Sequence, residues 1–318
     1  MNVLVLNCGS SSIKYKLYNM DNEAVLAQGG VERIGLDEAF IKITLPNGEK
    51  KIIMHDMPDH KEGVNFVFKC LLDPEFGAIK DLKEIDAVGH RVVQGGFHGT
   101  SHRYVSKRVC EILGLDQNNS KVITCHIGNG GSIAAVLNGK VMDTSMGLTP
   151  LAGLMMGSRC GDIDASAVTY LMEKLNMKPQ EMADFLNKKS GVLGITGISS
   201  DMRDIENAAN EGNEKAQLAL RMYEYRIKKY IGAYAAAMGG VDAIVFTAGV
   251  GENQTDLRED SCKGLEFLGI KINKEVNDKV RGKEAIISTD DSKVKVVVVP
   301  TDEEIVIARD TVELVTKK

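Results

Sequence analysis

Three short stretches of the chain combine glycines with residue types that bind phosphate. The first, residues 7–14, joins a glycine and three serine hydroxyls to Lys14 on the strand expected next, although it is not a Walker A loop. The second, residues 126–132, has three glycines within four positions, and the third, residues 249–253, directly follows an apolar stretch. Each alone is typical of a tight turn. Because backbone N–H groups beside glycine can cradle phosphate oxygens, the stretches together predict a phosphate clamp.

The elements that must position these stretches alternate between strands and helices. Residues 2–6 and 13–18 are expected to form a hairpin, and a similar strand, glycine loop and strand recur at residues 122–136. This weak repeat predicts two related domains. The other expected elements are a helix capped by Ser101 over residues 105–113, a long helix at 214–238, buried strands at 243–246 and 296–299, and a helix at 304–315. The predicted fold class is α/β.

The composition excludes several classes of protein. The 318 residues, 43% hydrophobic and 26% charged, are enough for two domains. The net charge of -5 comes without a basic stripe, so nucleic acid is not an expected partner. The apolar run at residues 2–6 is too short for a signal peptide or a membrane span, which predicts a cytoplasmic protein with no membrane partner. Six cysteines without a C-x-x-C pair indicate reduced thiols.

Six blocks of sequence, in order, resemble the acetate kinases, which form the acetokinase family of the actin-like phosphotransferase superfamily. They are VLVLNCGSSSIK at 3–14, GHRVV at 89–93, FHGTSH at 97–102, MGSRCG at 156–161, TAGVGEN at 247–253 and PTDEE at 300–304. The resemblance covers essentially the whole chain. It implies two actin-like (ribonuclease H-like) domains, residues 1–96 with about 305–318 and residues 97–304, with a nucleotide cleft between them.

The resemblance also implies a reaction and its partners. Members of the family reversibly transfer the γ-phosphoryl group of ATP to acetate, which gives acetyl phosphate and ADP, and they use Mg²⁺. Mn²⁺ is an alternative ion. A homodimer is the family expectation. Phosphoryl transfer needs in-line positioning and positive charge around the migrating group, so arginine, lysine and histidine are the expected catalytic types.

Individual roles carry over to the positions that match the family blocks. Asn7 and Glu303 would hold the metal ion, since a carboxylate is a hard oxygen ligand. The catalytic residues would be Arg91, His98 and Arg159, with Arg91 also gripping the substrate carboxylate. The apolar pocket for the acetate methyl would include Val93, Phe97 and Pro150. The residues that would bind the nucleotide are Ser10, Ser12, Lys14, His126, Ile127, Gly128, Asn129, Gly130, Asp201, Met202, Arg203, Gly249, Val250, Gly251, Glu252 and Asn253.

The chain departs from the family between Gly96 and Phe97. Several dozen residues separate the blocks of Arg91 and His98 in acetate kinases, whereas six residues separate them here. The missing segment carries an Asp-Thr-Ala-Phe-His motif, whose aspartate the family assigns to proton chemistry. The first domain is therefore expected to be incomplete, and loss of an interior strand exposes apolar surface and unpaired edge groups.

The missing segment leaves several interpretations open. The chain is an acetate kinase with impaired turnover, a kinase for a longer acid such as propionate or butyrate, or a non-catalytic nucleotide-binding pseudoenzyme. The gap itself is either a natural loss or an internal deletion of a normal gene. The hypothesis drawn from the sequence is that nucleotide binding survives better than acetate turnover.

Overall fold

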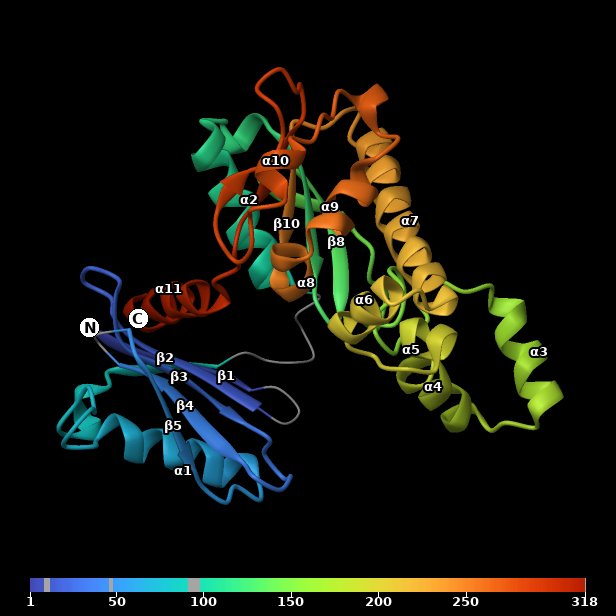
Figure 1. The fold of residues 1–318 in the computed structure, drawn as a ribbon. Helices are drawn as coiled ribbons and strands as arrows, with labels where there is room; N and C mark the ends of the chain where they lie inside the picture. The colour runs from blue at the N-terminus through green and yellow to red at the C-terminus, as the bar shows by residue number, and fades with distance from the viewer. Residues whose placement is uncertain (9–11, 46–47, 91–97, 318) are drawn as a thin grey trace. The chain divides into compact units, whose positions relative to one another are not determined.

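The computed structural model describes residues 1–8, 12–45, 48–90 and 98–317. The chain divides into two compact units, a first unit of residues 1–96 with 302–318 and a second unit of residues 97–301. Each unit contains a six-stranded sheet with helices packed on it (Figure 1). The predicted α/β class is therefore confirmed.

The first unit has the strand order β5-β4-β3-β2-β1-β6. β1 and β6 are parallel, and the other neighbours are antiparallel. Helix α1 packs on one face of the sheet and helix α11 on the other (Figure 1). The elements are β1 (Asn2–Cys8), β2 (Ser12–Asn19), β3 (Ala24–Glu32), β4 (Phe40–Thr44), β5 (Lys50–Met54), α1 (His60–Leu71), β6 (Ala87–His90) and α11 (Glu303–Thr316).

The two faces of this sheet follow from the alternation of side chains along its strands. Leu4 and Ile13 point toward α1 and are fully buried with Val67 of that helix. On the other face, a Cβ atom added to Gly89 would lie 2.4 Å from Oγ1 of Thr311 and 2.8 Å from Cγ2 of Ile307. A glycine is therefore required where α11 crosses β6.

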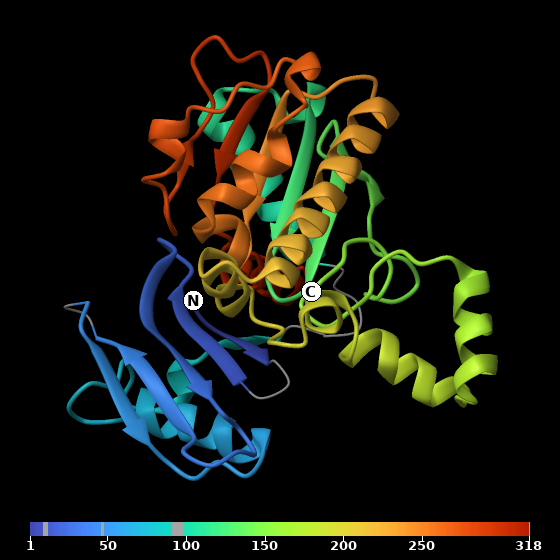
Figure 2. The same ribbon diagram turned by 45° about the vertical axis from the view of Figure 1, so that its right-hand side comes forward.

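The second unit has the strand order β11-β12-β10-β7-β8-β9, in which β7, β10 and β12 are parallel. The helices α2 and α7 cover its opposite faces, and Figure 2 shows α7 lying along the sheet. Its strands are β7 (Lys121–Ile127), β8 (Gly131–Leu137), β9 (Lys140–Thr144), β10 (Ala243–Thr247), β11 (Ala285–Ile286) and β12 (Lys295–Val298). Its helices are α2 (Gly99–Leu113), α3 (Ala165–Leu175), α4 (Pro179–Lys188), α5 (Gly191–Thr196), α6 (Met202–Asn210), α7 (Glu214–Ala237), α8 (Ala248–Asn253), α9 (Thr255–Cys262) and α10 (Lys274–Asn277).

Most of the expected elements are present, and two expectations were wrong. The two predicted hairpins are β1–β2 and β7–β8, and the long helix is α7. Ser101 does not cap α2, because the helix begins at Gly99 with His98 at the N-cap, and Ser101 is buried inside the helix. Residues 249–253 form helix α8 rather than a loop.

The strand β6 is an edge strand among the described residues. In the second unit, β10 lies between β7 and β12, whereas in the first unit β6 has β1 on one side alone. Val88 is 51% exposed, although its register partner Leu4 is fully buried. The described part of the first unit thus lacks a counterpart of β12, at the point where the sequence departs from the acetate kinases.

Two further expectations concern the cysteines and the membrane. All six cysteines are free thiols, and four of them are buried. Burial raises the pKa of Cys262 to about 12, which keeps that thiol protonated and unreactive at neutral pH. Among the described residues, we find no helix with the length and apolar character that crossing a bilayer requires.

Candidate functional site

The second unit brings three histidines together at the loop between β7 and β8. Helix α2 supplies His102, His98 is the N-cap residue that precedes this helix, and β7 supplies His126. The rings of His98 and His126 stack with their centroids 3.9 Å apart. Nδ1 of His126 lies 2.8 Å from Oγ of Ser101, whose hydroxyl accepts a hydrogen bond from Thr301 at 2.8 Å. These contacts fix the rings next to the predicted phosphate loop.

His102 is the most deeply buried of the three histidines. Its side chain bonds Thr124 and Ser132, both at 2.7 Å. Burial, and secondarily the neighbouring charge of His98, lowers the pKa of His102 to about 3. The ring is therefore neutral at physiological pH. Sequence reasoning passed over His102, because His98 is the N-cap residue in a left-handed conformation and helical spacing does not extend to it.

Arg159 and His98 both lie close to Gly130 in the loop between β7 and β8. A Cβ atom added to Gly130 would be 3.7 Å from Nη1 of Arg159 and 3.9 Å from Nε2 of His98. Nη1 of Arg159 also donates to the carbonyl of Pro150 at 3.3 Å, so the structure brings together a predicted catalytic residue and a predicted pocket residue. A small anionic group at Gly130 would meet both an arginine and a histidine.

A cavity of about 660 Å³ opens beside this loop within the second unit. Eight of the predicted nucleotide-binding residues line it, namely Gly128, Asn129, Asp201, Met202, Arg203, Gly249, Val250 and Asn253. Asp201 caps α6 and forms an ion pair of 2.6 Å with Arg203. The cavity therefore joins the second and third predicted phosphate stretches.

Four lining residues were missed by sequence reasoning: Ser200, Glu206, Gln254 and Arg281. Nε2 of Gln254 donates to Glu206 at 3.2 Å. Burial, with the nearby Asp256, raises the pKa of Glu206. The helical period could have found Glu206, which follows Met202 by one turn on the same face of α6.

The predicted residues Gly251 and Glu252 do not line this cavity. The carboxylate of Glu252 instead accepts hydrogen bonds from the backbone of Ala248 at 2.7 Å and of Thr301 at 3.2 Å. Ala248 has a φ of +66°, a left-handed conformation that a non-glycine residue rarely adopts. Glu252 thus stabilises the tight entry into α8. His126, Ile127 and Gly130 also lie outside the lining.

The first unit holds the two predicted metal ligands. The amide of Asn7 donates to Glu303 at 3.5 Å and to Glu304 at 3.4 Å. Lys16 pairs with Asp302 at 2.9 Å and with Glu304 at 3.8 Å. The carboxylates of Glu303 and Glu304 and the amide oxygen of Asn7 fit Mg²⁺ or Mn²⁺, because they are hard oxygen ligands.

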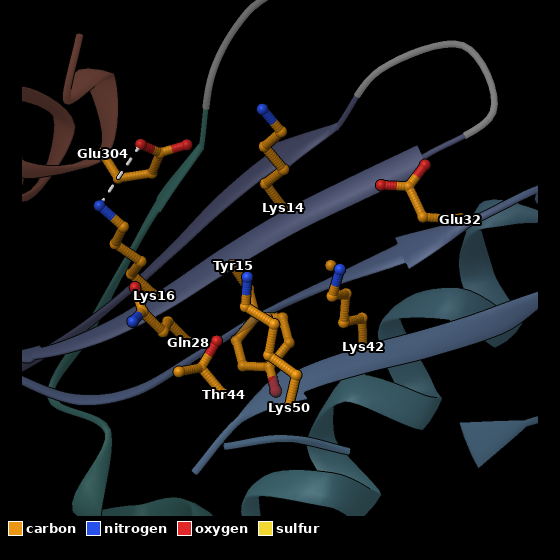
Figure 3. A pocket seen from close by; sticks show the side chains of 11 residues that line it. Lys14, Tyr15, Lys16, Gln28, Glu32, Lys42, Thr44, Lys50 and Glu304 are labelled. Atoms are coloured by element: carbon orange, nitrogen blue, oxygen red, sulfur yellow. Dashed lines mark ion pairs between the residues drawn. The ribbon is translucent and has the colours of Figure 1, made fainter. Parts of the chain in front are cut away.

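Lys14 lines a second cavity, of about 520 Å³, on the face of the same sheet on which α11 packs. Figure 3 shows Lys14, Lys16, Lys42 and Lys50 around this hollow, with Lys16 joined to Glu304. Sequence reasoning did not single out Lys42 and Lys50. Four predicted residues, Ser10, Arg91, Val93 and Phe97, lie outside the described residues, and Ser12 begins β2.

Comparison with known proteins gives a consistent assignment. The model of the acetokinase family matches residues 2–97 and 96–309. Acetate kinases of Bacteroides thetaiotaomicron and Phocaeicola vulgatus are 52% and 51% identical to the chain over 399 positions, which cover 100% of each chain. The crystal structure of Porphyromonas gingivalis acetate kinase matches with a TM-score of 0.90 and 46% identity, covering 99% of both chains. A propionate kinase from Francisella tularensis matches with a TM-score of 0.87 and 30% identity, covering 98% of this chain and 99% of its own.

Proposed function

The chain belongs to the acetokinase family, and from that membership we propose a role for each site residue in the phosphorylation of acetate by ATP. The reaction is reversible and also yields ATP from acetyl phosphate and ADP. The observation that carries the proposal is that Arg159 and His98 both lie close to Gly130, next to the cavity of about 660 Å³.

The nucleotide occupies this cavity. Met202 and Val250 offer apolar walls to the base, while the backbone of Gly128 and Asn129 faces the phosphates. Arg203 lies at the mouth of the cavity, with its side chain 84% exposed, and can meet a phosphate or the ribose without breaking a buried contact.

Transfer depends on positive charge around the migrating phosphoryl group. Arg159 supplies a planar guanidinium that can grip two oxygens at once, and His98 supplies a further hydrogen bond. By the family resemblance, Arg91 would also face the migrating phosphoryl group and Lys14 would meet the nucleotide phosphates. Val93, Phe97 and Pro150 would enclose the acetate methyl.

Asn7 and Glu303 hold Mg²⁺, with Mn²⁺ as a substitute. When bound, the ion neutralises charge that develops on the phosphate oxygens. Lys16 keeps Asp302 and Glu304 oriented at the start of α11. We also propose that the two compact units are the domains of a cytoplasmic homodimer.

The interrupted family match favours a second candidate function. The alignment with the relatives spans 399 positions, whereas the chain has 318 residues, and the family match breaks at residues 96–97, just after β6. The Asp-Thr-Ala-Phe-His motif is absent. We therefore propose that ATP binding is retained while acetate turnover is reduced, with a pseudoenzyme as the extreme case. A kinase for propionate or butyrate is the other alternative.

The test measures binding and turnover separately on the purified chain. ATP affinity is measured by titration calorimetry, and acetate-dependent ADP formation by a coupled assay with acetate, propionate and butyrate. We expect Arg159→Ala to abolish ADP formation and to leave ATP affinity within about threefold, while Arg221→Ala, an exposed arginine on α7, changes neither. Equal ADP formation by Arg159→Ala and the parent chain would overturn the assigned site. Turnover at the level of intact acetate kinases would overturn the proposal that loss of the missing segment reduces acetate turnover.

A further inference from the structure

We propose that His102, acting through Ser132, fixes which ring nitrogen of His98 carries a proton. The proposal deepens the function above, since it rests on His98 facing the phosphoryl group. It makes His102, Ser132 and Thr124 positioning residues that touch no substrate themselves.

A continuous chain of hydrogen bonds links the two histidines to the interior of the sheet. Nδ1 of His98 lies 2.8 Å from Oγ of Ser132, and the same oxygen lies 2.7 Å from Nε2 of His102. Nδ1 of His102 lies 2.7 Å from Oγ1 of Thr124, which donates to the carbonyl of Ala134 at 3.5 Å. Ser132 and Thr124 are fully buried, and His102 is 2% exposed, so water does not interrupt this chain.

Counting protons shows which atom donates in each of these hydrogen bonds. A neutral imidazole has one donor and one acceptor nitrogen, and His102 is neutral because burial lowers its pKa to about 3. We assign the hydroxyl proton of Thr124 to the carbonyl of Ala134, 3.5 Å away, so that Thr124 accepts from Nδ1 of His102 at 2.7 Å. Nε2 of His102 is then the acceptor for the hydroxyl proton of Ser132.

Ser132 has one hydroxyl proton, and it is used on His102. Toward His98 the serine oxygen can therefore only accept, so Nδ1 of His98 must carry a proton. Nε2 of His98, the atom near Gly130, then carries a proton only when the whole ring is a cation. Donation from Nε2 therefore requires His98 to be an imidazolium, which would add a second positive charge beside Arg159. Among the described residues, His102, His126 and Arg159 are ionisable groups that lie close to His98.

The sharpest test reverses the direction of these hydrogen bonds by a substitution at Thr124, the member farthest from His98. Thr124→Val keeps the β-branched shape but removes the acceptor for Nδ1 of His102. His102 then moves its proton to Nε2 and donates to Ser132, which in turn donates to His98. We therefore expect a substitution two hydrogen bonds beyond Ser132 to move the proton of neutral His98 from Nδ1 to Nε2.

The measurement is two-dimensional ¹⁵N–¹H NMR of the full chain with ¹⁵N-labelled histidine, which reports the tautomer of each of the six rings. Thr124→Ser should restore the parent pattern. The matched control is Ser101→Ala, which removes an equally buried hydroxyl bound to His126 and should leave His98 and His102 unchanged. A proton on Nε2 of neutral His98 in the parent chain, or an unchanged His98 in folded Thr124→Val, would overturn the proposal.

A second variant, Ser132→Ala, tests the proposal if Thr124→Val does not fold. Ser132→Ala cuts the hydrogen-bonded chain between the two histidines, so His102 should keep its proton on Nδ1 while the fraction of His98 with its proton on Nδ1 falls. A single Nδ1–H tautomer of His98 in Ser132→Ala would overturn the proposal.

Activity separates this inference from the proposed function. We expect Thr124→Val to lower kcat for ADP formation by about 10-fold or more and to leave ATP affinity unchanged, because Ser132 then donates to Nδ1 of His98 and opposes formation of the imidazolium. NMR reports the tautomers even in a chain without turnover. If the tautomers switch as expected while kcat stays constant, the control of the His98 tautomer by His102 and Ser132 is confirmed. The role of His98 in phosphoryl transfer is then overturned.

Discussion

The imidazole rings of His98 and His126 stack face to face, with centroids 3.9 Å apart and planes inclined by 17°. Each ring is anchored by a different buried hydroxyl, that of Ser132 for His98 and that of Ser101 for His126. A ring pair held from two elements has little freedom to turn. The stack therefore sets the angle at which His98 approaches Gly130.

Loss of the stack should weaken catalysis more than binding. We expect His126→Ala to lower kcat by about 2- to 10-fold, because an aromatic pair contributes roughly 0.5–1.5 kcal/mol beyond its burial. His126→Phe keeps the flat ring and should recover most of this loss, although it cannot bond Ser101. Steady-state ADP formation measures both variants, and an unchanged kcat in His126→Ala would contradict the prediction.

The contact between α11 and β6 should not tolerate a side chain at residue 89. In Gly89→Ala the new methyl would collide with Thr311 and Ile307, and overpacking of this kind costs about 1–3 kcal/mol. The free energy of unfolding in urea measures the loss, and Thr311→Ala in the same chain should relieve part of it. Gly232→Ala, in open space on α7, is the control and should be neutral or stabilising. Equal stability of the two alanine variants would contradict the role of Gly89.

Glu224 on α7 should make stability depend on pH. Burial, and then the nearby Asp260, raises the pKa of Glu224 from 4.5 to about 7. Between these values the folded chain keeps a proton that the unfolded chain has released, so this group destabilises the fold progressively as the pH rises toward 7. Glu224→Gln should raise Tm at pH 8 by about 2–4 °C for each kcal/mol regained and should leave it unchanged at pH 4. The exposed Glu173→Gln is the control, and a gain at both pH values would contradict the assignment.

The open edge of the first unit should promote self-association. Val88 on β6 is 51% exposed beside an unpaired strand edge of the described structure. We expect Val88→Lys to reduce concentration-dependent association in sedimentation velocity and to leave Tm within about 1 °C, because the change is at the surface. Leu148→Lys, at a residue 98% exposed in a loop, should not alter association. Equal effects of the two substitutions would show that β6 is not the contact.

Local sequence patterns predicted most of the elements and failed where a tertiary contact overrides a local preference. The hairpins followed from alternating apolar residues, and α7 from apolar residues spaced by three and four. The glycines at 249 and 251 indicated a loop, yet the residues form α8, because Glu252 stabilises the strained backbone of Ala248. Ser101 has the right chemistry for a cap but is bonded to His126 instead.

The sequence by itself determined the family, the order of the elements and the place of the missing segment, because these are properties of residue types and their spacing along the chain. Only the tertiary structure decided which polar side chains meet. His102 on α2, Thr124 on β7 and Ser132 on β8 join because the apolar face of α2 packs on the sheet and brings its polar residues to one end. Periodicity predicts which face of an element is buried, but not which residues of another element that face will contact.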